Sequence, residues 1–272
     1  MSPMNRVRGE TITDQKLGPV VSTLPAAGPD SSVTLHGSFV TLEPWSTSTH
    51  WASFWQNLQL LENPWLMDYF PFEEICSEAD LLKQVEHLVA VPDIILYAVL
   101  ADPACLNPTK EANGLQGSVQ HAEVLGFMAY SLAGTAHREI EIGALFAPVL
   151  QRTVAATEAH YMMLKNVFEP ANVQVGRTLA YRRVSWKCNS LNASSRRAAE
   201  RLGYVYEGTL RNHQIIRGRS RDTSWFSIID TEWAAVKAAL QKWLAGSNFD
   251  DHGMQVKPLG HIRAELSSKV GG

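Results

Sequence analysis

Two glutamates that stand two residues apart could carry acid–base chemistry. Glu139 and Glu141 open the segment EIEIGALF, in which apolar and charged residues alternate as they do in a β-strand. Residues two apart on a strand point to the same face, so both carboxyl groups would lie side by side. Two like charges that close raise each other's pKa, which brings one of them nearer to a useful general base. An exposed pair of strand carboxylates without a catalytic role is the alternative, and the sequence leaves it open.

The stretch QRTVAAT, residues 151–157, could bind a phosphate group. It leads from a strand through a turn into a helix. A helix N-terminus presents unpaired backbone N–H groups and the positive end of the helix dipole, which together attract phosphate. We therefore expect the N–H groups of about Thr153 to Thr157 to form an anion site, with Arg152 as a charged donor. A helix start without a ligand is the alternative.

A helix with one unusually small face begins after Asn192. The Asn192 side chain can cap this helix by accepting an N–H two or three residues further on, and Gly203 is typical of a helix end. At helical spacing, one stripe of the surface carries Ser195, Ala198, Ala199 and Leu202, of which only the last is large. Something must approach this stripe closely. Either a sheet packs tightly against it or a ligand lies beside it.

The composition excludes several classes of protein. The chain has 272 residues, 45% of them hydrophobic, with a net charge of −3 and three cysteines far apart. This charge argues against a nucleic acid or a membrane surface as partner, and the odd cysteine count favours reduced thiols. No apolar stretch suits a signal peptide or a membrane span, and no histidines pair at zinc-ligand spacing. We therefore expect a cytoplasmic protein that holds no metal.

Hydrophobic periodicity predicts one domain at residues 33–245, between a flexible N-terminal tail at 1–32 and a C-terminal tail at 246–272. The pattern predicts strands and helices in the order β-α-α-β-β-β-α-β-α-β-β, with a closing helix. The helices are expected at 47–61, 77–90, 155–168, from 192 to about 202, and 231–244. The strands are expected within 33–45 and at 94–101, 124–132, 139–146 and 178–188, with a hairpin over 213–229. The turn-rich segment 102–122 reads as a surface loop or ribbon.

Three segments of the chain together resemble a known family. They are FAPVLQRTVAATEA, NASSRRAAERLGYVYEGTLR and RGRSRDTSWFSIIDTEW. The first stands where the GNAT superfamily of acyl-CoA-dependent N-acetyltransferases has its pyrophosphate loop. The second is similar to the N-x-x-S helix and E-G-T-x-R element of the RimJ/RimL-type branch, and the third to its closing hairpin with R-D-T. Order and spacing match for all three, and the likeness covers residues 33–245.

This resemblance implies a mixed, mostly antiparallel, twisted α/β sheet flanked by helices, whose splayed central strands hold acyl-CoA. It implies direct transfer of an acetyl group from acetyl-CoA to a primary amine of a small molecule or an amino acid. A protein N-terminus as the acceptor is one alternative, and a protein that binds acyl-CoA without turnover is another. A homodimer is an open possibility.

The resemblance also implies roles for particular residues. The expected cofactor-binding residues are Leu145, Phe146, Gln151, Arg152, Thr153, Val154, Ala155, Ala156, Thr157, Asn192 and Ser195. Asn192 would hydrogen-bond the pantetheine arm, while Ser195 would lie near the thioester sulfur and relay a proton to it. Glu141 is expected as the general base, with Glu139 as the second choice. The expected substrate-binding residues are Trp65, Tyr69, Phe70, Glu139, Arg211 and His213, since aromatic walls attract cations.

The sequence departs from the family's pattern at several positions. Val154 and Ala156 replace the usual loop glycines, which keeps the N–H donors but reduces the clearance above them. Ala199 stands where most GNAT enzymes carry a tyrosine acid. Gln214 stands where some relatives place a glutamate base, which gives Glu141 more weight as the base.

Overall fold

The computed structural model describes residues 18–108, 121–250 and 252–270. Within them, one eight-stranded sheet has the order β1-β2-β3-β4-β5-β6-β8-β7. Its strands are β1 (Leu35–His36), β2 (Thr41–Pro44), β3 (Ile94–Ala101), β4 (Glu123–Ser131), β5 (Glu139–Phe146), β6 (Arg183–Asn189), β7 (Val205–Ile216) and β8 (Arg219–Ile229). Its neighbours are antiparallel except for the parallel pair β5 and β6. The mixed, mostly antiparallel α/β sheet predicted from the sequence is confirmed.

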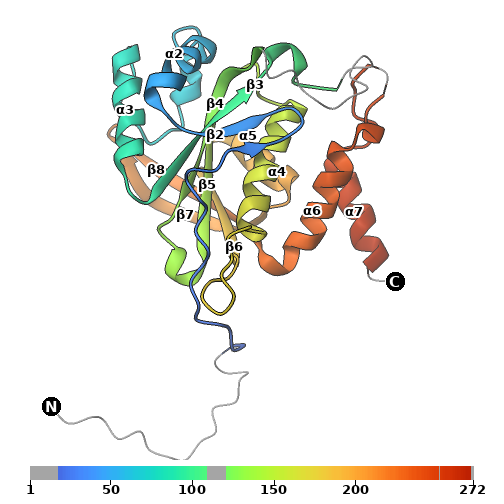
Figure 1. The fold of residues 1–272 in the computed structure, drawn as a ribbon. Coiled ribbons are helices and arrows are strands. Elements are labelled where there is room, and N and C mark those ends of the chain that lie inside the picture. The colour runs from blue at the N-terminus through green and yellow to red at the C-terminus, as the bar shows by residue number, and fades with distance from the viewer. Residues whose placement is uncertain (1–17, 109–120, 251, 271–272) are drawn as a thin grey trace, which may run out of the picture.

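Helices cover both faces of this sheet (Figure 1). They are α2 (Thr47–Leu58), α3 (Glu78–Ala90), α4 (Val154–Phe168), α5 (Ala193–Leu202), α6 (Asp230–Leu244) and α7 (Leu259–Val270), with short 3₁₀ helices η1 (Pro64–Met67), η2 (Pro103–Cys105), η4 (Thr135–His137) and η5 (Gly246–Asn248). Strand alternation divides the core in two. Leu96 and Ala98 of β3 belong to the cluster under α2 and α3, whereas Tyr97 and Val99 belong to the cluster under α4, α6 and α7.

Strands β5 and β6 separate partway along their length. They pair only at Glu139↔Arg183, Ile140↔Val184 and Glu141↔Ser185. Beyond Glu141, β5 continues to Phe146 and β6 to Asn189 without further pairing between them. The two strands therefore diverge and leave an opening in the middle of the sheet, as the family resemblance implied.

Helix α4 is buried on nearly every side. Its residues are apolar almost all round, which is typical of a helix enclosed by other elements. The Glu158 side chain, itself buried, fixes the helix to the chain between β1 and β2. Its carboxylate accepts the backbone N–H groups of Ser38, Phe39 and Val40 at 2.8, 2.6 and 3.2 Å. A Cβ at Gly37 would lie 2.5 Å from Glu158 Oε2, so the close approach requires glycine.

Most of the predicted elements are found in the structure, but β6 begins at Arg183 rather than near 178, and β7 begins at Val205 rather than near 213. The helix expected at 155–168 is α4, and the strand expected at 139–146 is β5. Ser77 caps α3 as predicted, because its side chain accepts from the backbone N–H of Asp80. None of the helices in the described ranges is long and apolar enough to cross a membrane.

The termini differ from their prediction. Residues 246–272 were expected to be a tail, but their described part contains η5 and α7. Leu259 and Ile262 of α7 are buried in the core. Only a few apolar residues anchor this segment, which is too sparse a pattern to reveal a helix. In the expected N-terminal tail, residues 1–17 lie outside the described ranges, while Ala27 is buried and donates its N–H to Leu179 O at 2.7 Å.

Candidate active site

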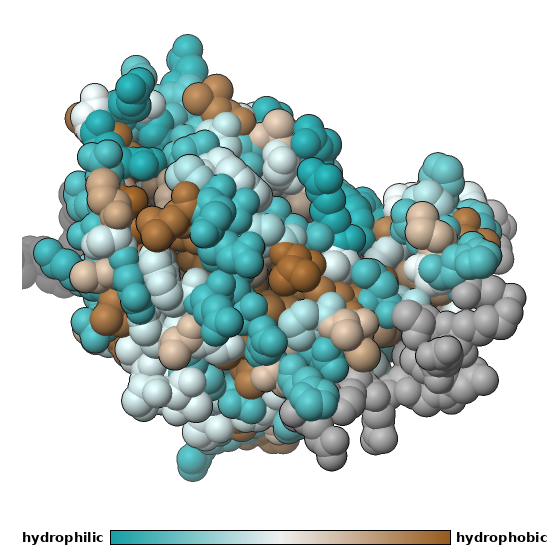
Figure 2. All heavy atoms as spheres, turned by 90° about the horizontal axis from the view of Figure 1, so that it is seen from above, coloured by the Kyte–Doolittle hydropathy of each residue, from teal (hydrophilic) through white to brown (hydrophobic). Residues whose placement is uncertain are grey.

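A pocket of about 950 Å³ occupies the opening between β5 and β6. Its walls come from the end of β5, the loop before α4, Trp186 of β6, helix α5, η1 and a segment after α6. Seen from above, apolar atoms are exposed in the middle of this face, between hydrophilic side chains (Figure 2). A pocket of this volume is in the range that binds cofactors and small molecules.

The structure brings the expected cofactor residues together around this pocket, with one exception. Leu145, Phe146, Gln151, Arg152, Thr153, Val154, Ala156, Thr157, Asn192 and Ser195 all line it. Ala155 does not, because it is fully buried and belongs to the core under α4. The loop and the small-faced helix, which are far apart in the sequence, therefore form opposite walls of one pocket.

The backbone N–H groups at the start of α4 already have partners, which the sequence did not predict. Val154 donates to Asn107 Oδ1 and Ala155 to Leu106 O, both at 3.0 Å, while Ala156 donates to Thr153 Oγ1 at 3.1 Å. The N–H groups that were expected to form an anion site are therefore not unpaired at Val154, Ala155 and Ala156. The segment at Leu106 and Asn107, which the sequence assigned only to a surface loop, packs against the helix start and satisfies its donors.

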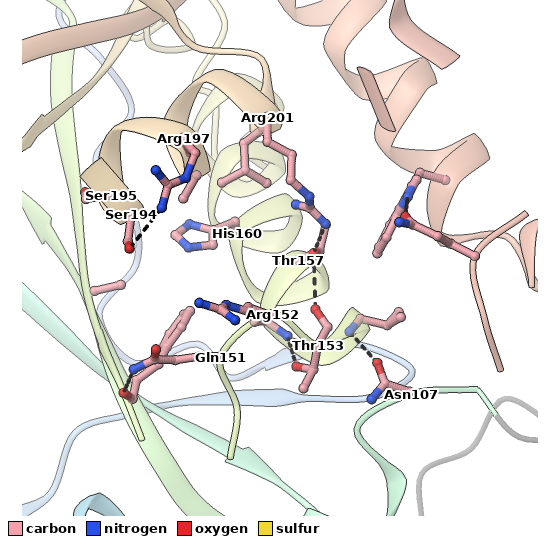
Figure 3. Close-up of a pocket in the computed structure, with 18 of the residues that line it drawn as sticks. Asn107, Gln151, Arg152, Thr153, Thr157, His160, Ser194, Ser195, Arg197 and Arg201 are labelled. Atoms are coloured by element: carbon pink, nitrogen blue, oxygen red, sulfur yellow. Dashed lines mark hydrogen bonds between the residues drawn. The ribbon is translucent and has the colours of Figure 1, made fainter. Parts of the chain in front are cut away.

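Three arginines supply positive charge around the same pocket. Arg152, Arg197 and Arg201 all line it, from the loop before α4 and from α5 (Figure 3). Arg201 donates to Thr157 Oγ1 at 2.8 Å, and its guanidinium lies 4.8 Å from the centre of the Trp243 ring. A diphosphate therefore fits the charge of the pocket, since arginine is well suited to bind phosphate oxygens.

Asn192 and Ser195 stand at the start of α5, as the sequence predicted. Asn192 Oδ1 caps the helix by accepting from Ser195 N at 2.9 Å. Ser195 Oγ in turn accepts from Trp186 Nε1 at 2.9 Å. Because an indole N–H can only donate, the Ser195 hydroxyl keeps its own hydrogen for another acceptor. Burial raises the pKa of the nearby Cys188 thiol, and Ser195 opposes that rise.

His160 is a pocket residue that the sequence analysis did not identify. It lies on α4 between Arg197 and Arg152 (Figure 3), with its ring near those of Phe146 and Trp186. Its Nδ1 is buried and has no hydrogen-bond partner among the described residues, and burial lowers the pKa of its imidazole to about 3. The ring is therefore neutral at physiological pH. A histidine in a mostly apolar helix was the sequence signal for it.

The two glutamates of β5 lie beside the pocket rather than on its wall. Glu141 Oε2 is 2.7 Å from Lys187 Nζ. Burial raises the pKa of Glu141, while the Lys187 ammonium opposes that rise. Glu139 accepts from Ser185 Oγ at 2.5 Å and from Arg183 Nε at 3.0 Å. Glu141 is thus the more base-like of the pair, whereas Glu139 is held in a network of hydrogen bonds.

Only part of the expected acceptor wall reaches the pocket. Trp65, Tyr69 and Phe70 line it, but Arg211 and His213 do not. Arg211 and His213 are exposed residues of β7, and His213 Nδ1 pairs with Thr223 Oγ1 at 3.0 Å. That part of the expectation is wrong, because these side chains lie outward on a strand whose residues are mostly exposed.

A different arginine, Arg221 of β8, contacts the segment that carries Tyr69. It is buried, and it donates to the backbone oxygen of Tyr69 at 3.3 Å. Within the part of the chain that the structure describes, its Nε has no hydrogen-bond partner. Burial lowers the pKa of its guanidinium, with the Glu141 carboxylate acting in the opposite direction. This arginine belongs to the R-D-T element of the sequence, but nothing in the pattern showed that it would contact the segment at Tyr69.

Comparisons with known proteins agree with this geometry. The model of the acetyltransferase (GNAT) domain matches residues 40–205. A GCN5-related N-acetyltransferase from Brucella melitensis is 31% identical, covers 89% of this chain and 98% of its own, and superposes with a TM-score of 0.74. A protein from Chromobacterium violaceum ATCC 12472, described as a probable acetyltransferase of the GNAT family, is 30% identical over 85% of this chain and 100% of its own, with a TM-score of 0.65. No curated protein shows a significant match. The fold and site define an acyltransferase, and the chain belongs to the GNAT acetyltransferase family.

Proposed function

We propose that the protein is a cytoplasmic, acetyl-CoA-dependent N-acetyltransferase of the RimJ/RimL type that acetylates a primary amine of a small molecule or amino acid. One observation carries the proposal. The pocket runs through the opening in the sheet, so that Ser195 and Trp186 line it together with Trp65, Tyr69 and Phe70. A cofactor that enters beside α4 and an amine that enters beside η1 would meet there, and proximity of the two reactants supplies much of the rate.

The residues of the pocket suit acetyl-CoA by their charge and hydrogen bonding. When bound, acetyl-CoA supplies an acetyl group activated as a thioester. Arg152, Arg197 and Arg201 would hold its phosphates, and the Asn192 side-chain amide would hydrogen-bond its pantetheine arm. Ser195 would donate its free hydroxyl hydrogen toward the leaving sulfur. The paired amides at Val154 and Ala155 reduce the contribution of the helix start, so the arginines carry more of the phosphate binding than the usual loop does.

The proposed general base is Glu141, acting on the acceptor ammonium through water. Its raised pKa makes it a stronger base than an ordinary glutamate, which favours proton removal. Glu141 does not line the pocket, but a Cβ at Gly143, the next residue on the same strand face, would meet no atom within 4 Å. This space leaves room for a bridging water between the carboxylate and the pocket. Trp65, Tyr69 and Phe70 would hold the cationic acceptor by cation–π contacts.

A protein that binds acyl-CoA without turnover is the second candidate. The partners of the α4 amides and the alanine at position 199 favour it. The related structures do not decide between acceptors, because their identity to this chain is low. One, from Salmonella typhimurium, modifies the N-terminal serine of ribosomal protein L7/L12 and is 16% identical. Another is a Vibrio cholerae spermidine N-acetyltransferase in complex with CoA and spermine and is 17% identical.

Thiol release from acetyl-CoA in the presence of a panel of amines tests the proposal. The panel should hold polyamines, amino acids, aromatic amines and short peptides, with products identified by a mass increase of one acetyl group. We expect release that depends on at least one small amine. Release at the background rate alongside tight CoA binding, measured by calorimetry, would support the non-catalytic protein. Turnover of peptides alone would favour a protein N-terminus as acceptor, and absence of CoA binding would contradict both candidates.

A further inference from the structure

A segment outside the family-matched range lines one end of the pocket. The family model ends at residue 205, yet Phe249 and residues 252–255 contribute to the pocket wall, together with Trp243 of α6. Phe249 and residues 252–255 were expected to belong to a tail, whereas Trp243 was expected in the closing helix. Their position at the pocket gives the C-terminal segment a role in binding that neither the motifs nor the family match assigns.

The segment is held firmly in place. Trp243 Nε1 donates to Gln255 Oε1 at 2.9 Å. The buried Asn248 side chain donates to the backbone oxygens of Trp243 and Lys257 at 3.2 and 3.1 Å and accepts the Lys257 N–H at 3.0 Å. These contacts fix both ends of the turn between α6 and α7. The wall is therefore preorganised, which lowers the entropic cost of binding a ligand against it.

The same segment packs against the chain that covers the start of α4. Gly253 has a φ of 73°, and a Cβ there would lie 2.1 Å from Pro108 O. Pro108 follows Asn107, whose side chain accepts the Val154 N–H. The C-terminal wall is thus continuous with the loop at the helix start, on the side away from Ser195. In Figure 3, Arg152 and His160 lie between Asn107 and Ser195.

The exposed side chains of this wall are of types that bind a planar heteroaromatic ring. Met254 is 65% exposed and lines the pocket, and a methionine sulfur makes favourable contacts with aromatic rings. Phe249 lies with its ring centre 5.5 Å from that of Trp243, which extends the apolar surface. His252 adds a polar ring at the rim of the pocket. Beside them, Arg201 lies over Trp243 and adds a positive charge for a phosphate.

We propose that the wall formed by Phe249 and residues 252–255 binds the adenosine part of acetyl-CoA. This inference rests on the proposed function. With the phosphates at the arginines and the sulfur at Ser195, the nucleoside must extend from the phosphates in the other direction. The end of the pocket at η1 is needed for the amine, so the C-terminal wall is the surface left for the purine. The Met254 thioether, the Phe249 ring and the Gln255 amide can pack against or hydrogen-bond a purine ring. The neighbouring Arg201 can bind the ribose phosphate.

Substitutions at two equally exposed residues test the inference. Met254 and Val256 are 65% and 64% exposed on the same segment, but only Met254 lines the pocket. We expect Met254→Asp to raise the Kd for CoA at least about tenfold, because the new charge repels the ribose phosphate of the adenosine part and the apolar contact with the purine is lost. Met254→Ala should raise it about threefold. Val256→Asp and Val256→Ala should leave the Kd near that of the unchanged protein.

A shorter ligand distinguishes loss of the adenosine contact from a general loss of ligand binding. The Kd for 4′-phosphopantetheine, which lacks the nucleoside, should be the same for the Met254 variants and the unchanged protein, in competition against labelled CoA. An equal Kd for CoA in Met254→Asp and Val256→Asp would overturn the inference, and so would an equal loss for both ligands. Neither result would touch the proposed function, which is tested separately by CoA binding and amine-dependent thiol release of the unchanged protein.

Discussion

Ser195 and Glu141 are the two residues on which the proposed chemistry depends, and their surroundings differ. Ser195 sits in the pocket with its oxygen already accepting from Trp186, so its hydroxyl hydrogen is oriented away from the indole. Glu141 sits beside the pocket, half-buried and paired with Lys187. The first residue is positioned by a neutral hydrogen bond, whereas the second is tuned by burial against an opposing charge. Each arrangement predicts a different response to substitution.

Glu141→Gln should flatten the rise of the reaction rate with pH. A general base works only when it is deprotonated, so the rate should increase as the pH passes through the raised pKa of Glu141. Lys187→Met should move that rise to higher pH, because the ammonium lowers the pKa of Glu141. Rate profiles of both variants against pH check this. If Glu141→Gln keeps the original profile, either Glu139 or a chain of water molecules is the base.

The carboxyl group of Glu141 should also affect the free energy of unfolding. The folded protein holds the Glu141 proton more tightly than the unfolded chain does, since its folded pKa is raised. Its contribution to the free energy of unfolding is therefore complete below the unfolded pKa and is lost as the pH rises through the folded pKa. Measured by denaturant, the free energy of unfolding should fall as the pH rises through this range, and Glu141→Gln should make that fall smaller. An unchanged fall would show that other groups cause it.

Ser195→Ala should lower kcat more than it lowers affinity for CoA. Loss of a proton relay costs about 10² in rate or more, whereas one neutral hydrogen bond to a ligand is worth about 1 kcal/mol, less than about tenfold in Kd. Trp186 Nε1 would lose its acceptor, so the free energy of unfolding should fall by about 1 kcal/mol. Steady-state kinetics, calorimetry and denaturant unfolding measure the three quantities. Ser195→Thr keeps a hydroxyl and should restore part of kcat; unchanged kcat in Ser195→Ala removes the residue from the mechanism.

At the scale of elements, local signals in the sequence predicted the helices and strands well. Ser77 and Asn192 accept from nearby N–H groups as caps do, because capping depends only on neighbours in the sequence. The partners of the α4 amides could not be predicted in this way. Asn107 lies 47 positions before Val154, so the contact follows from tertiary packing. The replacement of the loop glycines by Val154 and Ala156 pointed to reduced clearance, but not to the chain segment that fills it.

Asn107→Ala should change stability and CoA affinity in opposite directions. Without the side-chain oxygen, the Val154 N–H loses its partner, and the free energy of unfolding should fall by about 1 kcal/mol. The freed N–H at a helix start would then be available to a phosphate oxygen, so the Kd for CoA should fall severalfold. Thermal unfolding and calorimetry give the two values.

A matched control for this variant stands five residues earlier in the same segment. The Asp102 side chain accepts from Ala104 N at 2.9 Å and does not line the pocket. Asp102→Ala should therefore lower stability without altering the Kd for CoA. Weaker binding in Asn107→Ala would mean that Asn107 itself contacts the cofactor rather than competing with it.

At the scale of the whole molecule, the folded structure includes C-terminal residues that lie outside the family motifs used to interpret the sequence. Those motifs lie between residues 146 and 233 and correctly predicted the sheet, its opening and most of the pocket wall. The contribution of the C-terminal residues was missed, because three buried or half-buried apolar residues of α7, namely Leu259, Ile262 and Leu266, carry its packing. Helix α7 is also held against α5, because Arg263 donates to the backbone oxygen of Glu200 at 2.6 Å. Such contacts are long-range, and sequence periodicity does not report them.

Ile262→Ala tests whether α7 belongs to the same cooperative unit as the sheet. Ile262 is fully buried in the core cluster that also contains Tyr130 and Phe226. Removing a side chain of this kind from a core costs roughly 2–5 kcal/mol, so the midpoint of thermal unfolding should fall by roughly 5–15 °C in a single transition. His261→Ala, at an exposed neighbour on the same helix, should change the midpoint little. An unchanged midpoint for Ile262→Ala, or a separate early transition, would mean that α7 unfolds independently of the sheet, and that the C-terminal wall of the pocket is not part of the stable fold.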